Sequence, residues 1–201
     1  MNQRKIHFLI AFVCVLSTGC SPRDFLTRRL AADLIEGSSG FKASQQFFLR
    51  TGMITNKDYV SPEYLVLQHR GWITGVNVPC TANVGPAPCW DVALTPIGVE
   101  TFRGLIPSDM SSKQYFPIDI ARCQLLSTTG IVRNGNLADV DFTWKWMPLN
   151  EVGAALVDGG VNFRSTVGFK HYDDGWRLVE GSGGKSGQGL DDALRDAQPA
   201  P

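Results

Sequence analysis

Residues 138–147, ADVDFTWKWM, alternate regularly between apolar and polar side chains. The apolar positions are Val140, Phe142, Trp144 and Trp146, and the polar ones are Asp139, Asp141, Thr143 and Lys145. A period of two is typical of an antiparallel strand with one face on a core and the other in water. We therefore predict a strand that ends at Pro148, with Trp144 and Trp146 in the core and Lys145 facing solvent.

The sequence around this strand predicts an antiparallel meander of at least four strands. Asn134-Gly135 and Asp173-Asp174-Gly175 are tight-turn sequences between apolar runs. The predicted strands are Tyr115–Leu126, Ala138–Met147, Phe163–Tyr172 and Trp176–Glu180, with a helical turn or bulge at Asn150–Val157. Gly, Ser, Asp, Gln and Pro dominate from residue 181 onward, which predicts a flexible tail with a short helical stretch at Leu190–Leu194.

The N-terminal half predicts short helices and one hairpin. Apolar residues recur at helical spacing from an Asp24 cap to the GSSG sequence at 37–40. Ser61 and Thr95 each precede a proline, the order expected at a helix start, and the first of these helices runs to His69. The predicted strands are Gln45–Ile54 and the two arms of a hairpin, Trp72–Val78 and Trp90–Leu94.

Together these elements predict an α+β protein, with N-terminal helices and a short hairpin followed by a C-terminal antiparallel β-meander. Residues 20–180 suit a single domain, with possible sub-units at 24–110 and 114–180. Residues 181–201 form the predicted tail.

The first twenty residues, MNQRKIHFLIAFVCVLSTGC, have the layout of a secretory signal peptide. Arg4 and Lys5 precede an apolar run at residues 8–16, which is too short to cross a hydrocarbon core that needs about 20 residues. Ser17-Thr18-Gly19-Cys20 resembles the lipobox of bacterial lipoproteins, although the usual Leu sits one position early, at Leu16. The resemblance implies removal of residues 1–19 and attachment of lipid, palmitate included, to Cys20. It also implies a place in the cell envelope, and Ser21 after the cysteine favours the outer membrane, facing the periplasm.

Charge argues against nucleic acid as a partner. The chain has 19 basic and 19 acidic residues, and loss of Arg4 and Lys5 with the signal leaves 17 against 19, a net charge of −2. No basic field remains to collect phosphates. The expected partners are instead the membrane, reached through the Cys20 lipid, and a protein or peptide of the envelope.

Three cysteines lie beyond Cys20, in a compartment that permits disulfides. Cys80 and Cys89 flank the loop TANVGPAP, so we predict a local disulfide between them, with Cys123 as a buried free thiol. The sequence alone does not exclude a disulfide from Cys123 to Cys80 or to Cys89. Eight intervening residues and no neighbouring histidine match no common zinc pattern, and we predict neither a metal nor a cofactor.

Two stretches resemble known folds. The order of helix, strand, loop, strand and the helix start Leu94–Gly98 (LTPIG) resembles a winged helix, but its loop, residues 76–88, has no Lys or Arg to meet a phosphate, so a scaffold role is favoured. Residues 169–180, FKHYDDGWRLVE, resemble the closing hairpin of nuclear-transport-factor-like and cystatin-like folds. That resemblance implies a sheet curled around a helix.

The sequence predicts no catalytic residue. His69 and His171 read as structural histidines, and neither an HExxH nor a GxSxG motif is present. Asp139 and Asp141 share a strand face at a separation of about 7 Å, a spacing that acid–base pairs also use, but an ordinary solvated surface is favoured. Trp72 and Trp90 flank the disulfide loop and are the candidate binding surface.

Two hypotheses of function follow. The first is a lipid-anchored envelope protein that binds a protein, peptide or cell-wall component without catalysis. The second is a small-molecule carrier or enzyme with a pocket between a curved sheet and its helices. An exposed aromatic patch over a solid core would favour the first, and a polar crevice beside His171 would favour the second.

Overall fold

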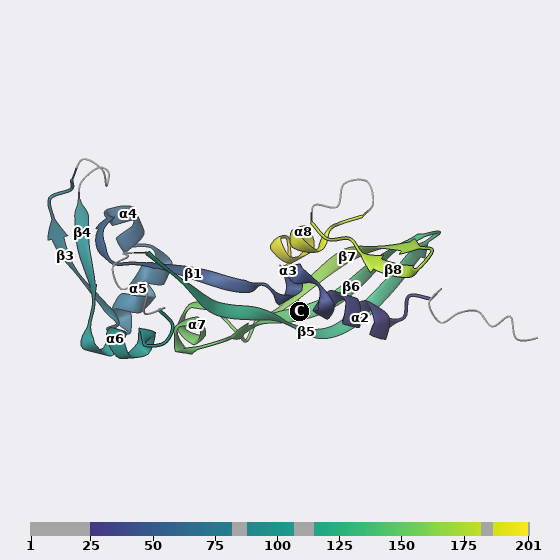
Figure 1. The fold of residues 1–201 in the computed structure, drawn as a ribbon, viewed down its shortest axis with the longest axis horizontal. Coiled ribbons are helices and arrows are strands. Elements are labelled where there is room, and N and C mark those ends of the chain that lie inside the picture. Colours follow the sequence, from purple (N-terminus) through teal and green to yellow (C-terminus); the bar gives the residue numbers. More distant parts are fainter. Residues whose placement is uncertain (1–24, 82–87, 107–114, 182–186, 201) are drawn as a thin grey trace, which may run out of the picture.

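The computed structural model describes residues 25–81, 88–106, 115–181 and 187–200. Helices account for 29% and strands for 46% of the structure, and every strand pairing among these residues is antiparallel. The predicted α+β class with a C-terminal meander is confirmed. The molecule is elongated, with two sheets that lie towards opposite ends (Figure 1).

The larger sheet has the strand order β1-β5-β6-β7-β8, with the short β9 paired to β7. Its strands are β1 (Ser44–Arg50), β5 (Tyr115–Asn134), β6 (Leu137–Pro148), β7 (Asn162–Tyr172), β8 (Gly175–Leu178) and β9 (Gln198–Pro199). Gly135 and Gly175 both have positive φ, which the two predicted hairpin turns require. β5 runs eight residues beyond the predicted end at Leu126, because its pairing with β6 continues to the turn although its apolar alternation does not.

A small lobe, residues 52–106, carries the second sheet in the order β2-β4-β3. Its elements are β2 (Gly52–Thr55), α4 (Asn56–Tyr59), α5 (Pro62–His69), β3 (Ile73–Val78), β4 (Cys89–Leu94) and α6 (Pro96–Phe102). Ser61 and Thr95 are the N-caps of α5 and α6, and β3 and β4 form the predicted hairpin. The single strand predicted at Gln45–Ile54 is two strands, because Gly52 at φ 75° turns the chain from one sheet into the other.

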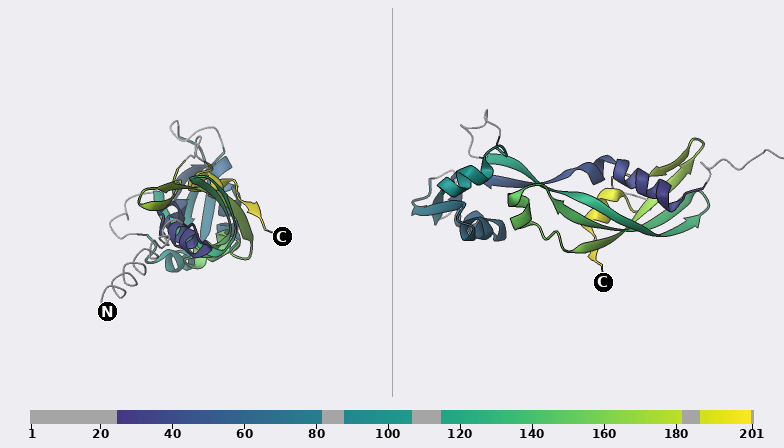
Figure 2. Two further views of the ribbon diagram at one scale, coloured as in Figure 1. Left: turned by 90° about the vertical axis from the view of Figure 1, so that its right-hand side faces the viewer. Right: turned by 90° about the horizontal axis from the view of Figure 1, so that it is seen from below.

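Three helices cover one face of the larger sheet. They are α2 (Arg28–Gly37), α3 (Ser39–Lys42) and α8 (Leu190–Arg195). Figure 2 shows the sheet curling around α2, as the resemblance at residues 169–180 implied. The N-cap of α2 is Thr27, whereas the predicted cap, Asp24, lies outside the described residues.

The hydrophobic residues form two core clusters that do not follow the expected boundary between 24–110 and 114–180. One cluster joins α2, α3 and α8 to strands β5–β8. The other joins the small lobe to β1, to the first half of β5 and to α7 (Glu151–Leu156). Gly153 of α7 lies against the carbonyl of Ile120, with no room for a Cβ between them, so the helix packs directly on β5.

Strand β6 has the predicted register, with one difference at its C-terminal end. Trp144 is 1% exposed, but Trp146 is only partly buried at the rim of the core, so its assignment to the core is corrected. Lys145 is half-buried rather than open to solvent, because β6 lies between two neighbouring strands that shield its stem.

The predicted flexible tail differs from the structure over residues 187–200. Leu190 and Ala193 of α8 are buried, and β9 pairs with β7. The Trp144 ring N–H donates to Ser165 Oγ at 3.0 Å, and that hydroxyl donates to the Ala193 carbonyl at 2.7 Å. A buried hydrogen-bond chain therefore holds a segment whose polar composition suggested disorder.

We expect the docking of α8 to contribute to global stability. Leu190→Ala removes a leucine that is 1% exposed and should lower the free energy of unfolding by about 2–5 kcal/mol. Leu65→Ala is the control, because Leu65 is also helical but is 49% exposed, and its loss should cost less than about 0.5 kcal/mol. Urea melts of both variants measure the difference, and equal midpoints would show that α8 is not part of the cooperative fold.

Candidate functional site

The end of β1 faces α4 and α5 across a shallow pocket of about 270 Å³. Its lining includes Phe48, Arg50, Asp58, Glu63, Tyr64 and Tyr115. Its lining residues come from segments far apart in the sequence. Among these segments is β1, which leads from the larger sheet towards the small lobe (Figure 1). The aromatic side chains and the arginine gathered here are the residue types that most often dominate recognition surfaces.

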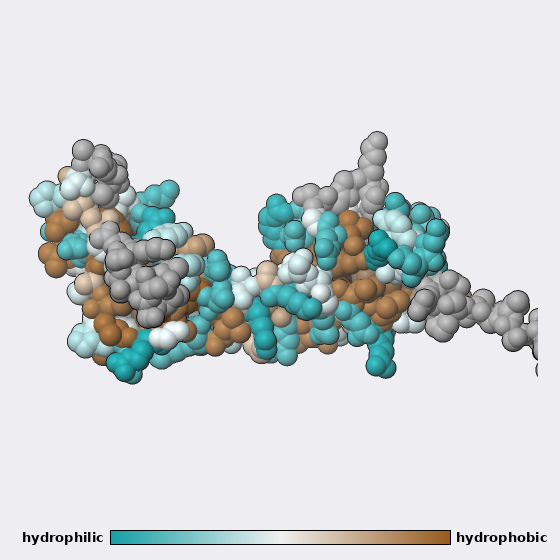
Figure 3. All heavy atoms as spheres, viewed as in Figure 1, coloured by the Kyte–Doolittle hydropathy of each residue, from teal (hydrophilic) through white to brown (hydrophobic). Residues whose placement is uncertain are grey.

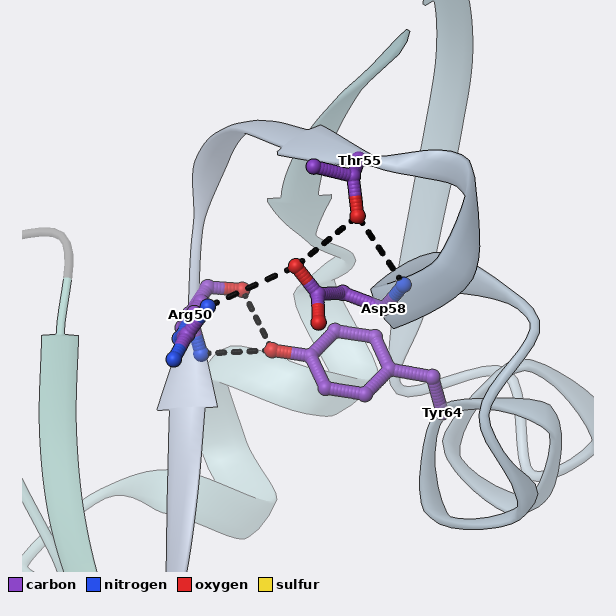
Figure 4. Close-up of polar contacts among 4 residues, drawn as sticks. All are labelled: Arg50, Thr55, Asp58 and Tyr64. Carbon is purple, nitrogen blue, oxygen red and sulfur yellow. Dashed lines mark hydrogen bonds and ion pairs between the residues drawn. The ribbon is translucent and has the colours of Figure 1, made fainter. Parts of the chain in front are cut away.

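Hydrogen bonds within the chain fix the segment after β1. Thr55 is the N-cap of α4, and its hydroxyl accepts from the Asp58 N–H at 3.2 Å. The same hydroxyl donates to the Asp58 carboxylate at 3.0 Å, which turns that carboxylate towards Arg50 at 3.4 Å (Figure 4). Both members of the Arg50–Asp58 pair are more than a third exposed, so its role is orientation more than stability.

Tyr64 of α5 closes the end of β1. Its hydroxyl accepts a hydrogen bond from the Arg50 N–H at 2.6 Å and donates one to the Arg50 carbonyl at 3.0 Å (Figure 4). Burial raises the pKa of Tyr64 to about 12, so the phenol stays neutral at physiological pH and keeps both bonds. Its chemistry is that of a structural clamp, since a general base needs a pKa nearer the working pH.

An aromatic shelf, defined here as Phe48, Tyr115 and Arg50, lies on the open face beside this clamp. The Phe48 and Tyr115 rings stack with centroids 5.1 Å apart, and the Arg50 guanidinium sits 5.4 Å from the Tyr115 ring centre. Phe48 is 42% and Tyr115 is 44% exposed. Stacked rings with an adjacent guanidinium offer apolar area at low cost in side-chain entropy, because each ring already restrains the other.

The shelf is absent from the predictions made from the sequence, although the sequence holds a signal for it. Phe47 and Phe48 are adjacent in a strand, so only one of them can face the core. Phe47 does so, packing against Tyr64 with ring centres 6.1 Å apart. The stacking of Phe48 on Tyr115 depends on the β1–β5 register, which the sequence does not reveal.

The structure does not bring Trp72 and Trp90 together on a surface. Trp72 is 3% exposed and meets Phe102 edge-on in the core of the small lobe. Trp90 is half-buried, stacks on Tyr59 at 4.3 Å and donates to Asn56 Oδ1 at 2.9 Å. Trp72 therefore cannot line a groove as proposed from the sequence, because it points into the core.

The predicted Cys80–Cys89 disulfide is confirmed, with Cα atoms 5.2 Å apart. It ties the start of β4 to the segment that follows β3, while most of the enclosed loop, residues 82–87, lies outside the described residues. Cys123 is a buried free thiol, and burial raises its pKa to about 12. A thiol held in its protonated form is a poor nucleophile. Cys20 lies outside the described residues.

The remaining sequence candidates have ordinary structural surroundings. Asp141 accepts a hydrogen bond from Thr166 Oγ1 at 2.6 Å and faces Arg164 on the neighbouring strand, while Asp139 is exposed. His171 packs beside Trp176, with ring centres 5.0 Å apart, and His69 is exposed in the last turn of α5. None of these residues belongs to the pocket beside β1.

No protein-family model, no curated protein and no solved structure matches this chain. Within the described ranges, no helix is long and apolar enough to cross a membrane. Among the same residues, no group of His, Cys, Asp and Glu side chains is placed to hold a metal ion. The residues of the site are therefore the basis for a proposal of function.

Removing the Tyr64 hydroxyl should destabilise the junction. Tyr64→Phe leaves the Arg50 N–H and carbonyl without their partner, and should lower the free energy of unfolding by about 1–3 kcal/mol. Tyr172→Phe, at a tyrosine that is 43% exposed, should change it by less than about 0.5 kcal/mol. Denaturant melts with matched losses in the two variants would contradict the clamp.

The pH dependence of the same variant is a second test. A pKa raised from 10.0 to about 12 means that the neutral phenol adds stability below pH 10, and that this stability is lost as the pH rises towards 12. The stability gap between wild type and Tyr64→Phe should therefore narrow from pH 8 to pH 11. Cys123, whose pKa is also raised, is present in both proteins, so its contribution cancels. A gap that stays constant over this range would place the Tyr64 hydroxyl in solvent.

Proposed function

We propose that this chain is a lipid-anchored protein of the bacterial cell envelope whose α+β domain binds another envelope protein, a peptide or a cell-wall component without catalysis. Lipid on Cys20 attaches it to the outer membrane, with the domain in the periplasm. The observation that carries the binding role is the aromatic shelf, an exposed and preorganised surface at the junction of the two sheets.

Two features of the chain support the location. The first twenty residues combine a basic start, an apolar run and a lipobox-like STGC ending at Cys20. The Cys80–Cys89 disulfide is of the kind that forms and persists in an oxidising compartment such as the periplasm. Both features favour export, although they come from different parts of the sequence.

The groups around the shelf favour binding over chemistry. Tyr64 is held neutral, and the Asp58 carboxylate is occupied by Thr55 and Arg50. Aromatic and arginine side chains, by contrast, supply much of the energy at protein interfaces when a partner desolvates them. The pocket itself is shallow, which suits a side chain of a larger partner better than an enclosed small molecule.

A second candidate function has one observation in its favour. A pocket of about 440 Å³ lies between α2 and β8, lined by apolar Leu34 and Leu178 and by charged Asp33, Arg177 and Glu180. On the face drawn in Figure 3, apolar residues gather near β8 at this end of the molecule. A small-molecule carrier would use this pocket between the curved sheet and its helices, so binding there would be independent of the shelf.

Attachment of lipid can be tested by metabolic labelling with a clickable palmitate analogue. Wild type should be labelled and should fractionate with membranes, because a multiply acylated cysteine anchors a protein stably. Cys20→Ala should lose the label and stay in the uncleaved form. Equal labelling of the two proteins would refute the anchor.

Binding can be tested by chemical cross-linking in intact cells, followed by detergent solubilisation and identification of the partners. A partner that cross-links to wild type and to Val76→Ala, but at least about tenfold less to a Phe48→Ala/Tyr115→Ala double variant, is the expected result. Val76 is the matched control because it is apolar, 64% exposed and on the other sheet. Undiminished cross-linking of the double variant would exclude the shelf as the binding surface.

A further inference from the structure

The backbone of β1 has an open side. β1 pairs with β5 on one side and is an edge strand of the larger sheet. Both main-chain groups of Arg50 bond to Tyr64, so they point away from β5. Main-chain groups two residues apart in a strand point the same way, so the N–H and C=O of Phe48 also point away from β5.

The residues opposite on β5 agree with this orientation. Pro117 lies opposite Phe48 and has no N–H to donate towards β1. Asp119 lies opposite Gln46, and its carbonyl accepts from the Asn150 side chain, which follows β6 on the other side of β5. No described residue other than Tyr64 takes up the outward groups of β1. Among the described residues, the edge is therefore open at Phe48 and closed at Arg50.

We propose that β1 binds an extended peptide as an added antiparallel strand, with an apolar peptide side chain on the aromatic shelf and a basic side chain beside Asp119. The inference rests on the proposed binding function and names its mode. The main chain of the peptide would exchange two hydrogen bonds with Phe48, and Tyr64 would mark the end of the available edge. Phe48 and Tyr115 lie on the same sheet face as that apolar side chain.

Charge selects the chemistry of the partner. Beside Arg50 the pocket holds two carboxylates, Asp58 and Glu63, against one guanidinium. At the other end of the shelf Asp119 is exposed and bonds to Gln46, a neutral residue. The Asp119 end therefore favours a basic residue, whereas the Tyr64 clamp ends the edge before a peptide residue could pair with Arg50. A second copy paired antiparallel through β1 would bring its own Tyr64 clamp and small lobe against Gln46, so a foreign basic peptide is the better occupant.

A synthetic peptide tests the mode directly. The probe is fluorescent Thr-Thr-Thr-Val-Thr-Lys-Thr, in which Val lies opposite Phe48 and Lys, two residues later, lies opposite Gln46 and beside Asp119. Its binding to the full chain in detergent is measured by anisotropy. The same peptide with N-methylvaline lacks the main-chain N–H that would donate to the Phe48 carbonyl. A version with Glu in place of Lys reverses the charge of the side chain beside Asp119. Each change should weaken binding by about tenfold.

Variants of the protein locate the site. Phe48→Ala should weaken binding of the parent peptide by about tenfold, whereas Val76→Ala should leave it unchanged. The Phe48 amide should exchange rapidly with solvent in the free protein and slowly with the peptide bound. A slow Phe48 amide in the free protein, undiminished binding of the N-methylvaline peptide, or no binding of the parent peptide would each overturn the inference. Loss of dimers in Phe48→Ala by sedimentation would assign the edge to a second copy instead.

The outcome is separable from that of the proposed function. If cross-linking in cells depends on Phe48 and Tyr115 but the N-methylvaline peptide binds as well as its parent, the shelf is a binding surface and strand addition is wrong. If the peptides behave as expected but no partner cross-links in cells, the β1 edge can bind an added strand but the proposed binding of an envelope partner is wrong.

Discussion

The structure depends on one strand that belongs to both hydrophobic cores. β5 has 20 residues, a length of about 65 Å in extended conformation. Its first half pairs with β1 and buries Phe116, Ile118 and Ile120 with the small lobe, while its second half pairs with β6 over the other core. Loss of either core would expose part of β5. The continuous backbone pairing of β5 therefore holds the two ends of the molecule together.

The junction between the two ends follows from this arrangement. β1 runs beside β5 and must then leave the larger sheet to build the small lobe, which it does at Gly52. At the end of β1 the main-chain N–H and carbonyl of Arg50 point away from β5, and the Tyr64 hydroxyl bonds to both. The neighbouring Phe48 has no such partner among the described residues. The same geometry that closes one end of β1 therefore leaves the rest of its edge available.

The β1 edge beside the aromatic shelf is protected by its surroundings. An exposed edge strand is a hazard because it can pair with any other strand, and proteins usually protect such edges. Here the edge is short, lies beside acidic side chains and ends at a clamp, features that restrict pairing to a short and basic segment. A surface of this kind is selective by charge and by length rather than by an enclosed pocket. The proposed lipid anchor would make even modest affinity effective, because an envelope partner would be confined to the same narrow space.

The sequence alone determined most of the local elements. Alternation in residues 138–147, the caps at Ser61 and Thr95 and the two glycine turns fixed strands, helices and hairpins, because each depends on near neighbours. The cysteine spacing predicted the disulfide for the same reason.

The tertiary structure decided the features that depend on distant segments. It placed Leu190 and Ala193 in the core through the Trp144–Ser165 hydrogen bonds, although their local composition indicated a tail. It buried Trp72, and it stacked Phe48 on Tyr115 across a register that separates them by 67 residues in the chain. Strand register and core packing depend on many distant residues at once, so they cannot be predicted from a short window of sequence.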